Sequence, residues 1–153
     1  MSGAYTLEQT QLVAATPEEV FAFFSDPANL GRITPPWLAF RIHDAPARLE
    51  AGSRLEYRIR WGFFTLRWVT RITRWNPPDD FQDVQEKGPY RTWIHTHRFT
   101  RTERGVRVDD RVEYALPLGF LGRIVHRLRV RRQLEEIFAF RRAAIEQIFA
   151  GRV

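Results

Sequence analysis

The sequence predicts an α+β protein in which a curved antiparallel sheet of about seven strands wraps around one long C-terminal helix. Residues 53–115 alternate apolar and polar side chains in successive runs separated by turn residues, which is the period typical of strands with one buried face. Residues 123–149 instead repeat apolar side chains at three- and four-residue spacing, as an amphipathic helix does. The apolar stripe of this helix indicates that it lies across the concave face of the sheet.

The chain is predicted to begin with a strand at residues 5–14, followed by a short helix. Thr16 is a good N-cap for that helix, Pro17 suits its first position, and Glu19 completes a capping box. The helix should end at Asp26-Pro27, because proline disfavours helical backbone at the residue before it.

A second short helix is predicted at residues 28–33, and it should end before Pro35-Pro36, which cannot continue a helix. The chain then leaves this point extended, so we expect a strand at residues 37–43. The remaining strands are predicted at residues 55–61, 64–72, 81–86, 93–99 and 106–115. The facing of strand 81–86 cannot be determined from its more polar pattern.

Strand 93–99 has an unusual composition on one face. Trp93, His95, His97 and Phe99 share that face by period-two alternation, so two imidazoles lie between two aromatic rings. Such a face suits a polar patch inside an apolar cavity better than a plain core.

The next strand, residues 106–115, contributes one acid, Asp110, to an otherwise apolar inner face. Symmetric pairing of the two strands about their turn brings this acid beside a histidine. The predicted pairs are Phe99–Val106, His97–Val108 and His95–Asp110.

Several interpretations of these polar residues stay open. They could anchor a ligand in an apolar cavity, or satisfy one another in a packed core without any ligand. His95 could act as a general base, with Asp110 fixing its tautomer, which makes these two the candidate catalytic residues. His95, His97 and Asp110 could also share a metal ion, although two histidines without a wider ligand set are a weak signal, and no metal is assigned.

The predicted ligand cavity lies between the sheet and the long helix. Its wall should combine the inward residues of the strands with the apolar stripe of the helix. The residues predicted to contact a ligand are Tyr57, Ile59, Trp61, Leu66, Trp68, Trp93, His95, His97, Phe99, Asp110, Val112, Tyr114, Leu134, Ile137 and Phe138.

Length and composition limit the class of protein. At 153 residues, the chain is predicted to form a single domain over residues 1–153. The absence of cysteine excludes disulfides, thiolate metal sites and a cysteine nucleophile. Because no signal peptide is visible and no apolar run approaches the roughly 20 residues of a membrane span, we expect a cytoplasmic protein, and no cofactor is predicted.

The net charge of +6 would suit a nucleic-acid partner, but its distribution argues against one. Lys87 is the only lysine, and the arginines are spread over the predicted strands and helix. Only residues 123–132 concentrate them, and a solvated helix face explains this group better than a phosphate site. No nucleic-acid partner is therefore predicted.

The connections of the predicted meander differ between its two ends. One end collects the apolar loops 61–64, 88–90 and 117–122, whereas the other end is polar. Clustered apolar loops indicate a cavity mouth or an interaction site, unless they only pack on the end of the long helix. Transient membrane or protein contact through Phe63 and Phe120 is the corresponding prediction, and a monomer or a homodimer fits equally.

Several stretches carry a resemblance to a known family. They are Ser25–Leu30, Ile33–Pro36, Gly88–Tyr90, His95–Phe99, Asp110 and Leu116–Gly119. Together with the order of elements, they resemble the SRPBCC superfamily of START, polyketide cyclase and Bet v 1-like proteins, and most of all its bacterial stand-alone ligand-binding SRPBCC domain proteins.

This resemblance implies a helix-grip fold with a deep cavity between the sheet and the C-terminal helix. Members of the superfamily carry lipids, sterols, polyketides or isoprenoids, some catalyse cyclisation, and an Hsp90-activating branch shares the fold. The expected function is therefore binding, as carrier or sensor, of a hydrophobic small molecule such as a lipid, isoprenoid or polyketide. The alternative is an enzyme similar to polyketide cyclases, aromatases or dehydratases that uses the His–Asp pair.

Overall fold

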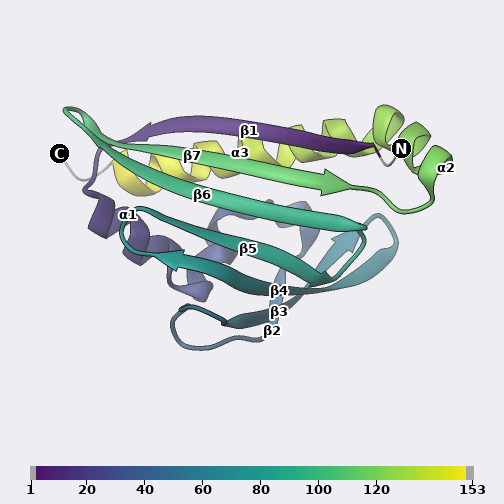
Figure 1. Ribbon diagram of the computed structural model, residues 1–153, viewed down its shortest axis with the longest axis horizontal. Helices are drawn as coiled ribbons and strands as arrows, with labels where there is room; N and C mark the ends of the chain where they lie inside the picture. Colours follow the sequence, from purple (N-terminus) through teal and green to yellow (C-terminus); the bar gives the residue numbers. More distant parts are fainter. Residues whose placement is uncertain (1–2, 151–153) are drawn as a thin grey trace.

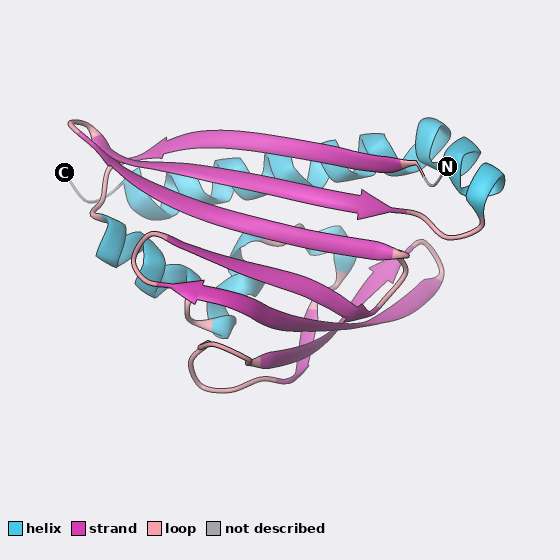
Figure 2. Cartoon of the chain, viewed as in Figure 1, coloured by secondary structure: helices cyan, strands magenta, loops and turns pink. Residues whose placement is uncertain are grey.

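A computed structural model describes residues 3–150 and confirms the predicted α+β helix-grip arrangement (Figure 1). The strands form one antiparallel sheet in the order β1-β7-β6-β5-β4-β3-β2, and the C-terminal helix lies behind it (Figure 2). The strands are β1 (Ala4–Val13), β2 (Arg41–Asp44), β3 (Arg54–Trp61), β4 (Phe64–Asn76), β5 (Asp80–Lys87), β6 (Thr92–Thr102) and β7 (Gly105–Ala115). The helical elements are α1 (Pro17–Phe24), η1 (Pro27–Ile33), η2 (Pro36–Leu38), α2 (Gly119–Val125), η3 (His126–Val130) and α3 (Arg131–Ala150).

The predicted capping box at the start of α1 is present. The Glu19 N–H donates to the Thr16 hydroxyl at 3.2 Å, and the Thr16 N–H donates to Glu19 Oε2 at 2.8 Å. These two bonds satisfy backbone donors that the first helical turn would otherwise leave unpaired. The helix is thereby held where Val20, Phe21 and Phe24 are buried against the sheet.

The strand predicted at residues 37–43 is wrong over its first half. Trp37 lies in the short 3₁₀ helix η2, Ala39 adopts a left-handed backbone with φ 46°, and the strand β2 begins only at Arg41. Pro36 takes part in this turn because its ring fixes a φ that also suits the start of a helical turn. Trp37 consequently projects from a turn rather than from a strand.

The register between β6 and β7 differs by two residues from the predicted one. Thr102 pairs with Gly105 across a two-residue turn, so the centre of the turn lies one residue later than symmetric pairing predicted. The observed pairs are Phe99–Val108, His97–Asp110 and His95–Val112. Because a shift of two residues keeps every side chain on its face, Asp110 remains on the same face as both histidines.

The C-terminal helix begins at Gly119, four residues earlier than predicted, and runs through a π-helical turn at η3. Gly122 packs so closely on the loop after β7 that a Cβ atom there would lie 2.2 Å from the Pro117 carbonyl oxygen. In the π-helical turn, the buried His126 ring lies 2.7 Å through Nε2 from the Tyr114 hydroxyl and stacks on Tyr5. Within residues 3–150, no helix is both long enough and apolar enough to cross a membrane.

Two apolar clusters fill the space between the sheet and the helices. The first joins α1 and the C-terminal half of α3 to the strands, and includes Phe21, Phe81, Phe99 and Phe149. The second joins η3 and the first half of α3 to the strands, and contains Trp68, Tyr90, Trp93, Val112, Tyr114, Val130, Leu134 and Phe138. The site described next lies where the two clusters meet.

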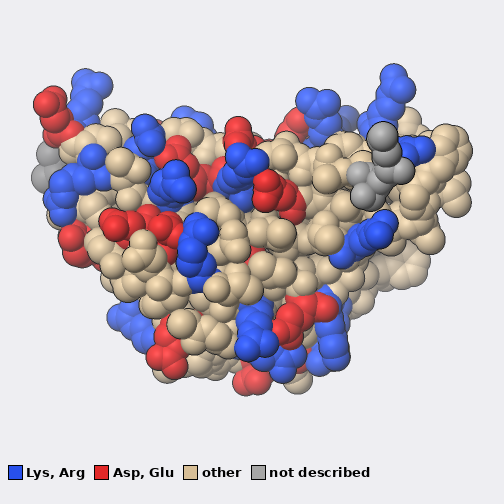
Figure 3. Space-filling model, viewed as in Figure 1, with Lys and Arg blue, Asp and Glu red and all other residues tan. Residues whose placement is uncertain are grey.

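The outer face of the sheet is polar and carries both signs of charge in alternation (Figure 3). Arg67 and Glu56 form an ion pair at 2.6 Å between the neighbouring strands β4 and β3, and Arg54 of β3 reaches across β4 to pair with Glu86 of β5 at 2.7 Å. Since such exposed pairs contribute little stability, the burial of the opposite face holds the sheet in place.

Candidate functional site

A cavity of about 470 Å³ lies between the concave face of the sheet and the C-terminal helix. This volume falls within the range of small-molecule sites. Its wall comes from β3, β4, β5 and β6 on one side and from α3 on the other, and residues 30–40 close a third side. The wall is mostly apolar, with aromatic rings from Tyr57, Trp68, Tyr90 and Trp93 among its members.

Most residues predicted to contact a ligand line this cavity. They are Tyr57, Ile59, Trp61, Trp68, Trp93, His95, His97, Leu134, Ile137 and Phe138. Leu66, Phe99, Asp110, Val112 and Tyr114 are not among the lining residues. Phe99 packs in the first apolar cluster, Val112 and Tyr114 pack in the second, and Leu66 is half-exposed.

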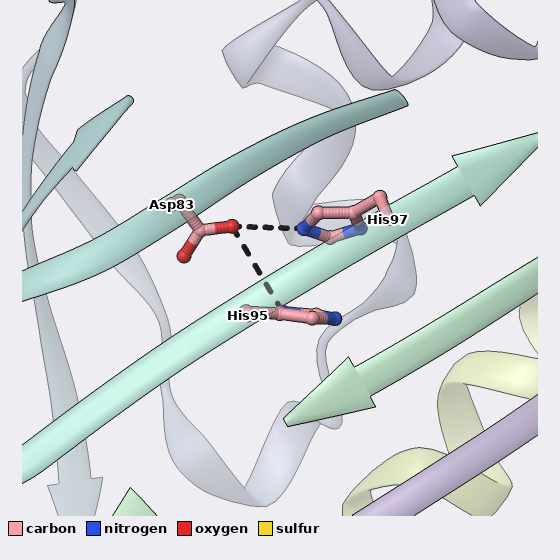
Figure 4. A group of neighbouring side chains, drawn as sticks. All are labelled: Asp83, His95 and His97. Carbon is pink, nitrogen blue, oxygen red and sulfur yellow. Dashed lines mark hydrogen bonds and ion pairs between the residues drawn. The ribbon is translucent and has the colours of Figure 1, made fainter. Parts of the chain in front are cut away.

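Five ionisable side chains form a cluster at the cavity, which we call the polar cluster: Asp83, His95, His97, Asp110 and Arg141. Neighbouring strands bring the first four together, because Asp83 pairs with His95 across β5–β6 and His97 pairs with Asp110 across β6–β7. Arg141 approaches from α3 and lies 3.5 Å through Nη2 from Asp110 Oδ1. Figure 4 shows Asp83 and the two imidazoles converging from adjacent strands.

His97 lies between the two carboxylates. Its Nε2 is 2.8 Å from Asp83 Oδ2, and its Nδ1 is 3.2 Å from Asp110 Oδ1. Burial disfavours the charged ring, but the bonds to Asp110 and Asp83 outweigh it and raise the pKa of His97 above the ordinary value. Nε2–H of the ring donates to Asp83, whereas Nδ1 lies in ion-pair contact with Asp110 and 3.5 Å from Nη2 of Arg141.

The pKa of His95 is shifted in the opposite direction to that of His97. Burial and the neighbouring charge of His97 lower the pKa of His95, despite its contact with Asp110. Its Nε2 lies 2.8 Å from Asp110 Oδ1, so the neutral ring donates that N–H and keeps a lone pair on Nδ1. The nearest carboxylate oxygen to Nδ1, Asp83 Oδ2, is 3.9 Å away, beyond hydrogen-bond distance.

Both acids of the polar cluster are held in their charged form. Burial opposes ionisation, yet Arg141 and the two histidines keep the pKa of Asp110 well below its ordinary value. The bond from His97, aided by His95 and Arg141, likewise lowers the pKa of Asp83 against the effect of burial. When His97 is protonated, the two carboxylates face two cations, His97 and Arg141, and the buried charges balance.

Sequence reasoning missed Asp83 and Arg141. Asp83 lies two residues after the buried Phe81, on the same face of the strand. This spacing was the feature of the sequence that could have predicted an inward Asp83. Arg141 interrupts the apolar stripe of the helix at the spacing of Leu134, Phe138 and Ile145, all of them buried. A charged residue at a stripe position was the signal for a buried cation.

The residues that could bind a metal ion differ from the predicted set. The atoms that could hold an ion belong to Asp83, His95 and His97 and lie within 4.8 Å of one another, so Asp83 takes the place predicted for Asp110. An ion bound here would compete with protonation of His97 and would lie near the guanidinium of Arg141. Elemental analysis of the purified protein would decide whether this group binds a metal.

The remaining wall of the cavity comes from a segment without regular strand structure. Residues Leu30, Ile33, Thr34, Trp37, Leu38 and Phe40 line it from η1, η2 and the turn that follows. Trp37 is 56% exposed and packs edge-on against Phe140 of α3, with 5.8 Å between the ring centroids. The turn that replaces the predicted strand thus places an aromatic side chain at the edge of the cavity.

Several solved structures share this fold. TTHA0849 from Thermus thermophilus is 18% identical, with a TM-score of 0.72 over 97% of this chain and 100% of its own. The di-domain ARO/CYC StfQ from the steffimycin biosynthetic pathway is 14% identical, with a TM-score of 0.76 over 97% of this chain and 51% of its own. Ara h 8.0201 is 12% identical, with a TM-score of 0.66 over 98% of this chain and 100% of its own. At such identities the similarity establishes the fold alone.

A search of curated proteins finds no sequence match to the chain. The family model described as polyketide cyclase/dehydrase and lipid transport matches residues 13–138, which span most of the chain. This match runs from the last residue of β1 to the first part of α3, and with the shared fold it confirms the resemblance to the SRPBCC superfamily. The chain belongs to the polyketide cyclase/dehydrase and lipid transport family.

Proposed function

We propose that the protein binds a hydrophobic small molecule, such as a lipid, isoprenoid or polyketide, in the cavity between the sheet and α3. The observation that carries this proposal is a cavity of about 470 Å³ with a mostly apolar wall and a few charged side chains, most of which belong to the polar cluster. Apolar walls supply affinity, and a few fixed polar groups supply orientation.

The polar cluster would orient the ligand. His95 and His97 line the cavity, whereas Asp110 lies behind them and holds both rings. A ligand group that donates a hydrogen bond, such as a hydroxyl, could reach the lone pair on His95 Nδ1. Asp110 is thus a positioning residue in this proposal, and His95 is the contact.

The proposed binding is tested by native mass spectrometry of the purified protein, with extraction of any compound that remains bound. A bound lipid or polyketide-sized compound, or saturable binding of the dye 8-anilino-1-naphthalenesulfonate, is the expected result. Ligand-free protein that also fails to bind the dye would overturn the proposal.

A matched pair of variants places the binding in the cavity. Ile137→Trp fills space in the lined wall, so the dye should bind at least about tenfold more weakly. Ile42→Trp makes the same change on β2, outside the lining residues, and should leave binding unchanged. Equal effects of the two changes would show that the dye binds elsewhere.

Catalysis is the second candidate function, and the geometry of His95 favours it. A neutral imidazole with its Nε2–H on a buried carboxylate and a lone pair on Nδ1 has the arrangement of a general base. If the protein is an enzyme, His95→Gln should abolish conversion of the recovered compound while its binding survives. If it is a carrier, the compound leaves the wild-type protein unchanged, and His95→Gln alters only its affinity.

We propose that the protein acts in the cytoplasm, without a nucleic-acid partner. A monomer is consistent with the exposed charges on the outer face of the sheet, and size-exclusion chromatography with light scattering distinguishes it from a homodimer.

A further inference from the structure

We propose that the helical segment of residues 118–128 docks the protein on an anionic lipid surface. This docking does not depend on which compound fills the cavity. The segment carries an apolar face that points away from the protein.

The outward face of this segment is apolar where a surface helix is normally polar. Phe120, Ile124 and Leu128 recur at four-residue spacing, and Leu121 and Val125 lie beside them. All five are between 41% and 76% exposed, and Leu118 just before them is 77% exposed. Such a contiguous exposed apolar face marks an interaction site.

The inward face of the same segment is already occupied by the protein. Gly122, His126 and Val130, also at four-residue spacing, are buried. His126 is held by the Tyr114 hydroxyl at 2.7 Å and by stacking on Tyr5. The helix therefore cannot rotate to bury its apolar side without breaking these contacts.

The charge around the apolar face has one sign. Arg123, Arg127 and Arg129 are exposed beside it, and the sequence contains no acidic residue between Glu113 and Glu135. Arg131 and Arg132 pair with acids one turn further on, at 3.2 and 3.0 Å. An apolar helical face flanked by arginines fits the boundary between anionic headgroups and acyl chains.

A second copy of this chain fits the face less well. In a two-fold dimer the same patch would meet itself, so Arg127 and Arg129 of one copy would come close to those of the other. Like charges at an interface oppose association. An anionic lipid surface complements both the apolar centre and its basic edge.

The hairpin between β3 and β4 supports the same orientation. It lies at the same end of the sheet as α2 (Figure 1), and Phe63 at its tip is fully exposed, with Phe64 72% exposed. Trp61 and Gly62 of this hairpin also line the cavity. Docking at this end would bring one edge of the cavity to the lipid surface.

Vesicle co-sedimentation tests the proposal. The protein should bind vesicles of mixed phosphatidylcholine and phosphatidylglycerol at low salt, bind far less at high salt, and not bind vesicles of phosphatidylcholine alone. Failure to bind the mixed vesicles would overturn the proposal.

Two pairs of variants assign the binding to this segment. Phe120→Ser/Leu128→Ser should abolish vesicle binding, whereas Leu12→Ser/Ile42→Ser, at exposed apolar positions on β1 and β2, should not affect it. Arg127→Gln/Arg129→Gln should weaken binding by at least about tenfold, since each basic residue near an anionic surface contributes measurably. The control for charge is Arg98→Gln/Arg104→Gln, exposed on β6 and on the turn after it.

Light scattering separates docking from self-association. A monomer that binds mixed vesicles supports the proposal. A dimer that Phe120→Ser/Leu128→Ser converts to a monomer would overturn it and assign the face to a second copy. Circular dichroism on each variant confirms that the fold is retained.

Discussion

The polar cluster places charged side chains in the interior, whereas the helical segment 118–128 places apolar side chains on the surface. The two regions differ in whether the fold supplies partners for these side chains. The cluster buries charged groups, and each has a partner within the fold. His97 bridges Asp83 and Asp110, His95 contacts Asp110, and Arg141 lies beside them. The segment exposes large apolar side chains that the described part of the chain does not cover.

The two regions differ in their need for a partner outside the chain. A buried charge without a counter-charge costs several kcal/mol, so the balanced polar cluster can exist before any ligand arrives. An exposed apolar face hardly destabilises the folded monomer. Its side chains contribute favourable free energy only when another surface removes them from water. The cluster therefore indicates a preorganised interior, and the segment indicates contact with another surface.

The largest expected effect comes from removing the shared acid of the cluster. Asp110→Ala leaves Arg141 and the two histidines without their common carboxylate, and should lower the free energy of unfolding by about 3–5 kcal/mol in urea denaturation. The control is Asp109→Ala on the opposite face of β7, where an exposed ion pair with Arg107 should be worth about 1 kcal/mol or less.

If Asp110→Ala does not fold, Asp110→Asn provides the same comparison with the shape of the side chain preserved. It should remain less stable than Asp109→Asn. Equal losses at the two positions would show that the buried charges are not coupled as the distances indicate.

A smaller, pH-dependent effect should come from His97. Because its pKa is raised in the folded state, protonation favours folding; this contribution is complete below the ordinary histidine value of about 6.5 and is lost as pH rises through the raised folded-state pKa. His97→Gln should therefore destabilise the protein more near pH 6 than near pH 9, measured by urea denaturation at both.

His95 provides the contrast within the same cluster. Its pKa is lowered, so its protonation disfavours folding, and its contribution is lost as pH falls from the ordinary histidine value toward the lowered one. His95→Gln removes this loss, so the free energy of unfolding of the variant should fall less than that of the wild type as pH drops below about 6.5. The same pH trend for both variants would contradict the opposite directions of the two pKa shifts.

The smallest expected effect on stability comes from the outward face of the helical segment. Phe120→Ser or Leu128→Ser should change the free energy of unfolding by no more than about 0.5 kcal/mol, because both side chains are mostly exposed. Leu134→Ser on the same helix, where the side chain is buried in the second apolar cluster, should cost about 2–5 kcal/mol. Thermal unfolding of the three variants would measure the contrast.

Local pattern predicted most of the fold. Period-two alternation located the strands of the meander, the Thr16–Glu19 capping box located α1, and the spacing of apolar residues located α3. These features follow from short-range geometry, which sequence neighbours determine. The start of the long helix and the strand at 37–43 were misjudged because their outcome depends on backbone packing at Gly122 and on the turn after Pro36.

The site was only partly predictable. Alternation placed His95, His97 and Asp110 on one buried face, and this survived a register error of two residues because such a shift preserves the face. Alternation could not place Asp83 or Arg141 at the site. The facing of the strand that carries Asp83 was undetermined, and Arg141 lies on a helix far along the chain.

Patterns among neighbouring residues were enough to predict the order of the strands and helices, the face on which the two histidines lie, and the apolar character of the loop 117–122. Packing between distant elements brings Asp83 and Arg141 into the polar cluster and leaves the apolar side chains of segment 118–128 pointing outward. The physical reason is that alternation and helical spacing act between neighbours in the chain, whereas charge pairing and burial depend on which distant elements pack together.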